Sequence, residues 1–455
     1  MLSGIVGAQP GTLDASFDPG TGLNIGSATV ALQSDGMILI GGNFTSYNGV
    51  SRDRVARIDP DGTLDSTFDP GNGANGLVTC IVLQPDGKIL IGGSFSSYNG
   101  IPRGSIARLN TDGGLDLTFD PGSGTSLTVF SIAIQPDGKI IIGGNFTSFN
   151  GSGTDFIARL NTDGSLDNSF DPSSGADNTV ASISLQADGK ILIAGFFSSY
   201  SGTPRNRIAR LINDGSLDVS FDPGAGPDAL LQTITQQPDG KILAGGPFSY
   251  YDGSGRNSIV RINVDGSMDA SFDPGTGPTG NFIGIPSIAI QADGKILIGG
   301  GFTEYNGTPQ NRIARLNADG SLDSAFDSGA GADGQVSSIA VQPDGKILIG
   351  GSFTSYDGVA RRGIARINGA LISGLDAGSD PLIMAIWPNP AQDLVHVGYI
   401  EKAHSIRLLN ALGKQLQVSR ISSTFSLTGC APGTYVLQVL DAHGTVIARS
   451  PVVKQ

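Results

Sequence analysis

An aromatic residue followed by a small polar residue and a glycine recurs seven times along this 455-residue chain. Aromatic faces beside amide or carboxylate groups are suited to binding sugars or peptides. A second interpretation is structural: Asn-Gly and Asp-Gly turn the chain while the aromatic ring packs over the edge of a sheet. The candidate ligand-binding residues are Tyr47, Tyr98, Phe149, Tyr200, Tyr251, Tyr305, Tyr356, Asn48, Asn99, Asn150 and Asn306.

Arginines also recur shortly after these aromatic residues, and a ring of them would attract an anionic ligand. They are Arg52, Arg103, Arg205, Arg256 and Arg361, with Thr154 and Gln310 at the other two positions. Aspartates are predicted on the adjoining segments: Asp69, Asp120, Asp222, Asp273 and Asp18. Arginine and carboxylate groups form bidentate pairs, so we interpret this pattern as an ion pair repeated for architecture.

Few residue types suited to catalysis occur before residue 383. That region has no His and no Trp, and its only Cys and Glu are Cys80 and Glu304. Histidine-bound metals, cysteine nucleophiles and Ser-His-Asp triads are therefore not expected there. A carboxylate pair acting on a glycosidic bond remains open. Such a site would need a departure from the repeat, and the departures are Phe196, Asp155, Pro247, Glu304 and an insertion within Gly275 to Pro286.

The segment from Asn161 to Asp167 superficially resembles an oxygen-rich calcium loop. It lacks the further carboxylates and the terminal Glu of such a loop. A hairpin stabilised by Asx turns accounts for each of its residues. We predict no metal site and no cofactor.

These residues are positioned by a repeat of about 50 residues. Phe17, Phe68, Phe119, Phe170, Phe221 and Phe272 lie 51 residues apart, and Phe326 follows 54 later. In the third copy, short apolar runs at 129–135, 139–146, 157–161 and 166–171 predict four strands, and Asp137-Gly138 predicts a hairpin between the first two. One such unit cannot bury both faces alone, so the period predicts the blades of a propeller.

The phase of the repeat predicts how the ring closes. The chain begins with a lone fourth strand, Leu13 to Asp18, and its last copy ends after the third strand at Ile367. Joining the two gives an all-β, seven-bladed β-propeller over residues 9–368 with four-stranded blades and no open edge.

The phrases QPDGKILIGGSF, IARLN and DGSLDxSFD resemble the delta-60 repeat family of bacterial β-propellers. This resemblance implies a propeller of extracellular or cell-surface proteins. It transfers no catalytic residues.

A different composition begins after the last repeat. Residues 369–382 read as a linker, and the short apolar runs of residues 383–455 predict a small β-sandwich. This segment resembles the type A C-terminal sorting domain of the type 9 secretion system, through Pro388, Asn389, Pro390, Gly413, Gly433 and Tyr435. The resemblance implies passage across the outer membrane and the secretion machinery as a partner.

The N-terminus and the charge bear on location and partners. Residues 1–8, MLSGIVGA, are interpreted as the remnant of a truncated signal peptide. The net charge is -13, which separates into +3 for residues 383–455 and -16 for the rest. Such a negative propeller would repel nucleic acid. No apolar run reaches about 18 residues, so no transmembrane segment is expected.

Together these patterns predict a secreted or surface-attached propeller that binds a glycan or protein ligand as an adhesion module and is not an enzyme. Two alternatives remain: an enzyme acting on glycans through Asp or Glu in the asymmetric loops, and a structural surface coat.

Overall fold

The computed structural model describes residues 9–280, 282–369 and parts of the segment 382–454. The chain separates into two compact units, one formed by Ala8–Ala370 and the other containing Leu371–Gln455. No helix occurs among the described residues.

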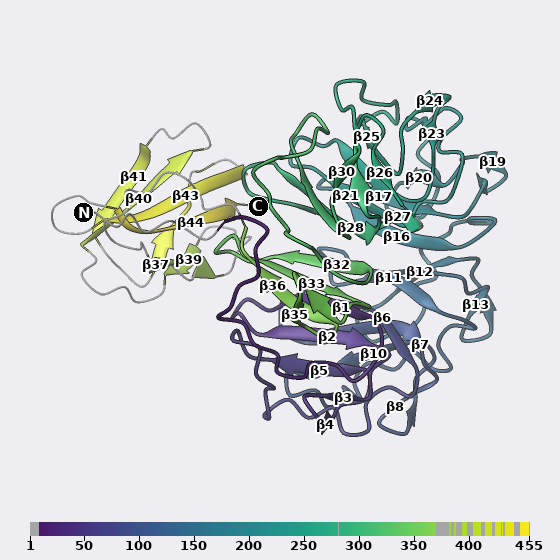
Figure 1. Ribbon diagram of the computed structural model, residues 1–455. Helices are drawn as coiled ribbons and strands as arrows, with labels where there is room; N and C mark the ends of the chain where they lie inside the picture. Colours follow the sequence, from purple (N-terminus) through teal and green to yellow (C-terminus); the bar gives the residue numbers. More distant parts are fainter. Residues whose placement is uncertain are drawn as a thin grey trace, which may run out of the picture. The chain divides into compact units, whose positions relative to one another are not determined.

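Each copy of the repeat in the first unit forms a three-stranded antiparallel sheet, called blade 1 to blade 7 in chain order (Figure 1). The first strands are β1 (Ala28–Leu32), β6 (Leu77–Leu83), β11 (Val129–Ile134), β16 (Val180–Leu185), β21 (Thr233–Gln236), β27 (Phe282–Ile290) and β32 (Val336–Val341). The middle strands are β2 (Ile38–Gly42), β7 (Ile89–Ser94), β12 (Ile140–Gly144), β17 (Ile191–Gly195), β22 (Ile242–Gly245), β28 (Ile296–Gly301) and β33 (Ile347–Gly351). The third strands are β5 (Val55–Ile58), β10 (Ile106–Leu109), β15 (Ile157–Leu160), β20 (Ile208–Leu211), β25 (Ile259–Ile262), β31 (Ile313–Leu316) and β36 (Ile364–Ile367).

A short hairpin links the middle and third strands of every blade, and Figure 1 shows these hairpins at the outer circumference. They are β3 (Ser46–Tyr47) with β4 (Val50–Ser51), β8 (Ser97–Tyr98) with β9 (Ile101–Pro102), β13 (Ser148–Phe149) with β14 (Ser152–Gly153), β18 (Ser199–Tyr200) with β19 (Thr203–Pro204), β23 (Tyr250–Tyr251) with β24 (Ser254–Gly255), β29 (Glu304–Tyr305) with β30 (Thr308–Pro309), and β34 (Ser355–Tyr356) with β35 (Val359–Ala360). The connector entering each blade bridges to its hairpin, as Leu23 does to Tyr47. Hairpins and connectors together are called the hairpin rim.

The fourth segment of each blade is shorter than the sequence predicts. Leu166 forms a single bridge to Leu160 instead of a strand reaching Asp171. The carboxylate of Asp167 accepts hydrogen bonds from the amide of Ser169 at 3.0 Å and its hydroxyl at 2.7 Å. This Asx turn bends the chain away immediately after the bridge.

The predicted Asp-Gly turns form as expected between the first and middle strands. In blade 3 the carboxylate of Asp137 accepts from the amide of Lys139 at 3.1 Å, and Gly138 has a φ of 84°. Such a φ suits glycine because it has no Cβ.

The N-terminal segment completes blade 7. Leu13 bridges Ile367, and the amide of Asp14 donates to the carbonyl of Arg366 at 2.9 Å. The first strands β1 and β32 also contact each other, and Figure 1 shows blade 1 beside blade 7. The ring therefore closes at residues 9–18.

The hydrophobic core lies between neighbouring blades. One buried cluster, for example, joins Leu90 and Ile106 of blade 2 to Val129, Ile140 and other residues of blade 3. Glycines in the middle strands permit this close approach: a Cβ on Gly143 would lie 2.7 Å from a methyl of Val180. Each blade is thus stabilised mainly by its neighbours.

The second unit contains two sheets. One has the order β37 (Leu382–Ile383), β44 (Val446–Lys454), β43 (Gly433–Leu440), β40 (Ser405–Asn410) and β41 (Gln415–Arg420), and the other has β38 (Ile386–Trp387), β39 (Leu394–Val397) and β42 (Thr424–Ser426). Ile406, Leu408 and Leu437 of the first sheet and Phe425 of the second share one core. This arrangement is the β-sandwich that the sequence predicts.

Candidate functional site

The seven aromatic residues of the hairpin rim are buried, with at most 1% of their surface exposed. The hydroxyl of Tyr47 donates to the carbonyl of Gly62 at 2.6 Å. Five other tyrosines repeat this bond, whereas Phe149 has no hydroxyl. Burial, assisted by the negative charge of Asp69, raises the pKa of Tyr98 well above its usual range. The rings fasten the hairpins to the blades, which corrects the expectation that their faces are open to a sugar or peptide.

The four asparagines that follow these aromatic residues are exposed at the hairpin tips. Asn48 has a φ of 48°, a left-handed conformation that asparagine tolerates better than most residues. Its side-chain oxygen accepts from the amide of Thr21 in the incoming connector at 3.2 Å. Asn99, Asn150 and Asn306 repeat this contact. They position the connectors, and a role for them in ligand binding stays a prediction.

The recurring arginines lie partly or fully buried beside the connectors. Arg103 places Nη1 3.7 Å from Asp120 Oδ1, and the same contact joins Arg256 to Asp273 at 3.9 Å and Arg361 to Asp18 at 3.6 Å. One nitrogen approaches one oxygen, so the predicted bidentate geometry is wrong. In the described residues no carboxylate lies within 4.0 Å of Arg52 or Arg205.

A second set of arginines forms the ion-pair clusters, one on the third strand of each blade. In blade 2, Arg108 Nε lies 2.7 Å and Lys88 Nζ 2.8 Å from Asp116 Oδ2. The guanidinium of Arg108 also lies 4.9 Å from the ring centroid of Phe119 and donates to the carbonyl of Thr162 in the next blade at 2.6 Å. The equivalent pairs are Arg57–Asp65, Arg159–Asp167, Arg210–Asp218, Arg261–Asp269, Arg315–Asp323 and Arg366–Asp14.

The carboxylates of these clusters are held in the charged form. Burial opposes ionisation of Asp116, but hydrogen bonds from Lys88, Thr118 and Arg108 outweigh it and keep its pKa well below the usual range. Asp14, Asp167, Asp218 and Asp269 follow the same pattern. Donors and acceptors are matched within the fold, so the clusters are architecture, as the sequence analysis proposes for them.

The asymmetric insertion alters the hairpin rim of blade 6. It adds the strand β26 (Pro278–Thr279), which pairs with β29. The hydroxyl of Thr279 donates to Glu304 Oε2 at 3.0 Å. Glu304 is exposed and tied to the insertion, and a role for it in catalysis is not tested by this arrangement.

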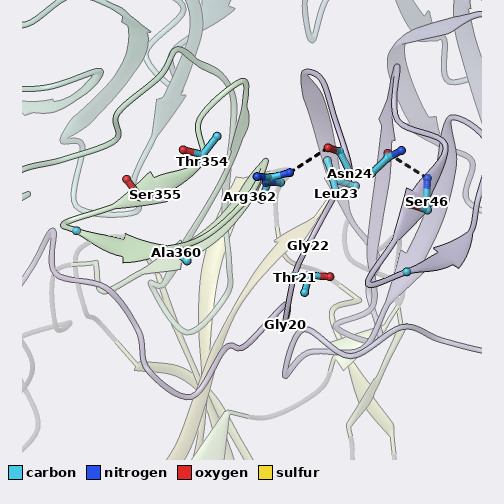
Figure 2. A pocket seen from close by; sticks show the side chains of 12 residues that line it. Gly20, Thr21, Gly22, Leu23, Asn24, Ser46, Thr354, Ser355, Ala360 and Arg362 are labelled. Atoms are coloured by element: carbon cyan, nitrogen blue, oxygen red, sulfur yellow. Dashed lines mark hydrogen bonds between the residues drawn. The ribbon is translucent and has the colours of Figure 1, made fainter.

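A groove of about 710 Å³ opens between blades 7 and 1 (Figure 2). We call it the blade 7–1 groove, and it is lined by Gly20, Thr21, Gly22, Leu23, Asn24, Ser46, Gly49, Thr354, Ser355, Gly358, Ala360 and Arg362. The connector 20–24 and the hairpin β3–β4 supply one wall, and the hairpin β34–β35 with Arg362 supplies the other. In Figure 2 the side chain of Arg362 points to Asn24, whose carbonyl oxygen accepts from Arg362 Nη1 at 3.2 Å.

Arg362 is not among the candidates that the sequence suggests. The search there followed residues that recur, whereas Arg362 stands where the other copies have Asp53, Gly104, Asp155, Asn206, Asn257 and Asn311. Comparing the copies position by position would have exposed the departure. The groove itself joins residues from the two ends of the repeat, which the sequence keeps some 340 positions apart.

Within the described residues, no three or more His, Cys, Asp or Glu side chains are arranged to hold a metal ion. None of the described strands or loops gives way to a helix suited to crossing a bilayer.

The fold of residues 9–369 is that of a seven-bladed β-propeller closed by its own N-terminal segment. The chain belongs to the DUF5122 β-propeller family, a domain of unknown function. The family model matches residues 33–68, 84–119, 135–170, 186–221, 237–272, 291–326 and 342–369. Residues 385–454 match a secretion system C-terminal sorting domain.

The sorting-domain match confirms the resemblance to the type IX tail and makes the protein a secreted or cell-surface one. Gly433 begins β43, and Tyr435 is buried in the core of the sandwich. Pro388, Asn389, Pro390 and Gly413 lie outside the described residues, as does the interpreted signal remnant at residues 1–8.

Solved structures share the propeller fold at low sequence identity. A catalytically inactive virginiamycin B lyase from Staphylococcus aureus with quinupristin is 16% identical, with a TM-score of 0.50 over 78% of this chain and 98% of that one. The extracellular domain of a putative hybrid two-component system from B. thetaiotaomicron is 14% identical, with a TM-score of 0.49 over 97% and 57%. PorZ, a surface component of the type-IX secretion system of Porphyromonas gingivalis, is 15% identical, with a TM-score of 0.44 over 96% and 60%.

The chain thus spans about three fifths of the length of the first solved structures that it matches. No curated protein sequence matches it.

Proposed function

We propose that the protein is a ligand-binding or adhesion module, exported by its sorting domain and recognising an extracellular glycan or protein through the hairpin rim. The contrast between the two sets of polar groups carries this proposal. The ion-pair clusters use their donors and acceptors within the fold, whereas the rim exposes amide, hydroxyl and backbone groups around a groove of about 710 Å³. Concave polar surfaces on a rigid scaffold are where ligands commonly bind.

The buried tyrosines support this proposal in a different way from that first expected. They anchor each hairpin at its base, as the Tyr47 to Gly62 bond at 2.6 Å illustrates. A surface held in this way changes little on binding, which limits the conformational entropy lost in the complex. The exposed asparagines at the hairpin tips are then available in fixed positions.

Binding of the full-length chain to an array of bacterial and host saccharides and extracellular proteins tests the proposal. We expect saturable binding to a defined set of probes that weakens when the rim is altered in full-length chains carrying Asn48→Ala, Asn99→Ala and Asn150→Ala together. A matched triple variant at exposed turn residues away from the rim, Asp35→Ala, Asp86→Ala and Asp137→Ala, controls for folding and surface charge.

Absence of binding to any probe, or equal binding by the rim variant and the wild type, would overturn the proposal. Self-association without a ligand would favour the structural coat instead. Chemical change of a bound saccharide would favour the enzyme.

A further inference from the structure

The most unusual cation of the propeller lies in the blade 7–1 groove. Residues 9–369 contain 22 Lys and Arg side chains, and only that of Arg362 is classed as exposed. The others are buried or half-buried, most of them in the ion-pair clusters or beside the connectors. Its neighbour Arg361 illustrates the difference, since its side chain is 11% exposed and lies 3.6 Å from Asp18.

No ion pair involving Arg362 occurs among the described residues. Its one hydrogen bond given by the structure runs from Nη1 to the carbonyl of Asn24 at 3.2 Å. That bond crosses from blade 7 to blade 1 and fixes the side chain at the wall of the groove. A guanidinium has five N–H donors in a planar fork, so donors remain for a ligand.

The equivalent position in other blades performs a neutral task. Asn206 and Asn311 donate to the carbonyls of Ala225 and Ala330 in the following connector, at 2.9 and 3.0 Å. Glycines of the connectors contact this backbone in the same way: Gly22 faces the carbonyl of Arg362, as Gly226 faces that of Asn206. The positions are therefore structurally equivalent, and a cation here is not required by the fold.

The opposite wall is also altered in the direction that favours an anion. Asn24 stands where three other connectors have Asp177, Asp228 and Asp333. Taking these two positions together, the grooves from 7–1 to 6–7 carry formal charges of +1, -1, 0, -2, -1, 0 and -1. The blade 7–1 groove is the single positive one, within a part of the chain whose net charge is -16.

We propose that the blade 7–1 groove binds a saccharide carrying a carboxylate, such as a uronic acid residue, with Arg362 holding the carboxylate. This inference rests on the proposed binding function and specifies its ligand. An arginine fork matches a carboxylate geometrically. The acidic surroundings disfavour dense polyanions, so one carboxylate on an otherwise neutral body fits the field of the propeller.

The remainder of the groove suits the neutral, hydroxyl-rich part of a sugar. Its lining supplies the hydroxyls of Thr21, Ser46, Thr354 and Ser355, together with glycine backbone. Leu23 is buried and offers little apolar surface. A peptide would need apolar pockets for its side chains, which this lining lacks.

Two variants of the full-length chain test the proposal. Arg362→Asn introduces the residue that three other blades have at this position, so the fold should tolerate it. Asn206→Asp changes the net charge by the same amount at the equivalent position of blade 4, where Asp53 and Asp155 show that Asp is accepted. Isothermal titration would compare trisaccharides ending in glucuronate or galacturonate with their neutral and sulfated counterparts.

We expect the wild type to prefer the uronate forms, Arg362→Asn to weaken that binding roughly tenfold or more, and Asn206→Asp to leave it nearly unchanged. Equal loss in both variants would indicate a general field effect and overturn the assignment. Stronger binding of the sulfated form, or no preference for the uronate, would also overturn it.

Failure of the inference can be separated from failure of the proposed function. A ligand whose binding is insensitive to Arg362→Asn would leave the binding function in place and remove this site. No binding by the wild type to any saccharide or protein probe would remove both.

Discussion

The ion-pair clusters and the hairpin rim belong to the same repeat but follow different rules. In the clusters, an Arg, an Asp and an aromatic ring recur in all seven blades, with Arg to Asp distances of 2.6 or 2.7 Å. In the rim, the position of Arg362 holds Asp, Gly, Asn or Arg according to the blade. Uniformity accompanies groups whose partners lie within the fold. Departure accompanies groups that face solvent, which is where recognition can differ from blade to blade.

Acid offers the broadest way to separate the two regions, because it acts on all the clusters together. The cluster carboxylates have pKa values below the ordinary range, so the unfolded chain binds more protons than the folded chain at low pH. Their stabilising contribution is complete above the unfolded pKa of about 4 and is lost as pH falls through the depressed folded values.

We therefore expect the free energy of unfolding to be nearly constant from pH 7 to about pH 5 and to fall steeply below about pH 4. Urea unfolding followed by fluorescence at several pH values measures this. The same series with Arg362→Asn should give a parallel curve, because the rim arginine takes no part in the clusters. A flat profile down to about pH 3 would contradict the assigned role of the carboxylates.

Opening the ring at its closing cluster is the next largest perturbation. Asp14→Ala removes the acceptor of Arg366 and Lys346, which lie 2.7 and 2.9 Å away, and leaves a buried arginine unpaired. Loss of one partner of a buried pair costs about 3–5 kcal/mol. Asp116→Ala removes the same contacts inside the ring and serves as the control.

We expect Asp14→Ala to lower the urea midpoint at least as much as Asp116→Ala and to increase proteolysis within residues 9–18. The reason is that the N-terminal segment is joined to blade 7 only by non-covalent contacts, whereas Asp116 lies on a continuous chain. A clearly smaller effect of Asp14→Ala would show that this segment contributes little to closure.

The sequence predicts the regular part of this molecule well, for physical reasons that single copies display. Asp137-Gly138 forms the expected turn because only local groups are involved, and the phase of the repeat identifies the closing segment before Asp18. It fails where local and distant contacts compete. The fourth strand is cut short by an Asx turn at Asp167, although the same residues alternate as a strand would.

The site was harder to predict because its features depend on burial and on neighbours in space. A tyrosine beside an asparagine looks the same whether its ring is exposed or buried. The spacing of 15 residues between Tyr47 and Gly62, which the hydroxyl bridges at 2.6 Å, becomes informative only with the fold known. Arg362 meets Asn24 only because the ring closes.

Blade 1 contains a natural defect in its ion-pair cluster, and repairing it gives the smallest and sharpest test. Met37 stands where six other blades have a lysine, so Asp65 pairs with Arg57 alone, at 2.6 Å. In blade 2 the equivalent Lys88 lies 2.8 Å from Asp116 and remains 30% exposed. Met37→Lys should therefore stabilise the propeller by about 0.5–1 kcal/mol, seen as a higher urea midpoint that salt reduces. Met37→Gln, of similar length but uncharged, should give no such gain. If lysine and glutamine behave alike, charge at this position contributes nothing, and the clusters owe their stability to arginine and the aromatic ring alone.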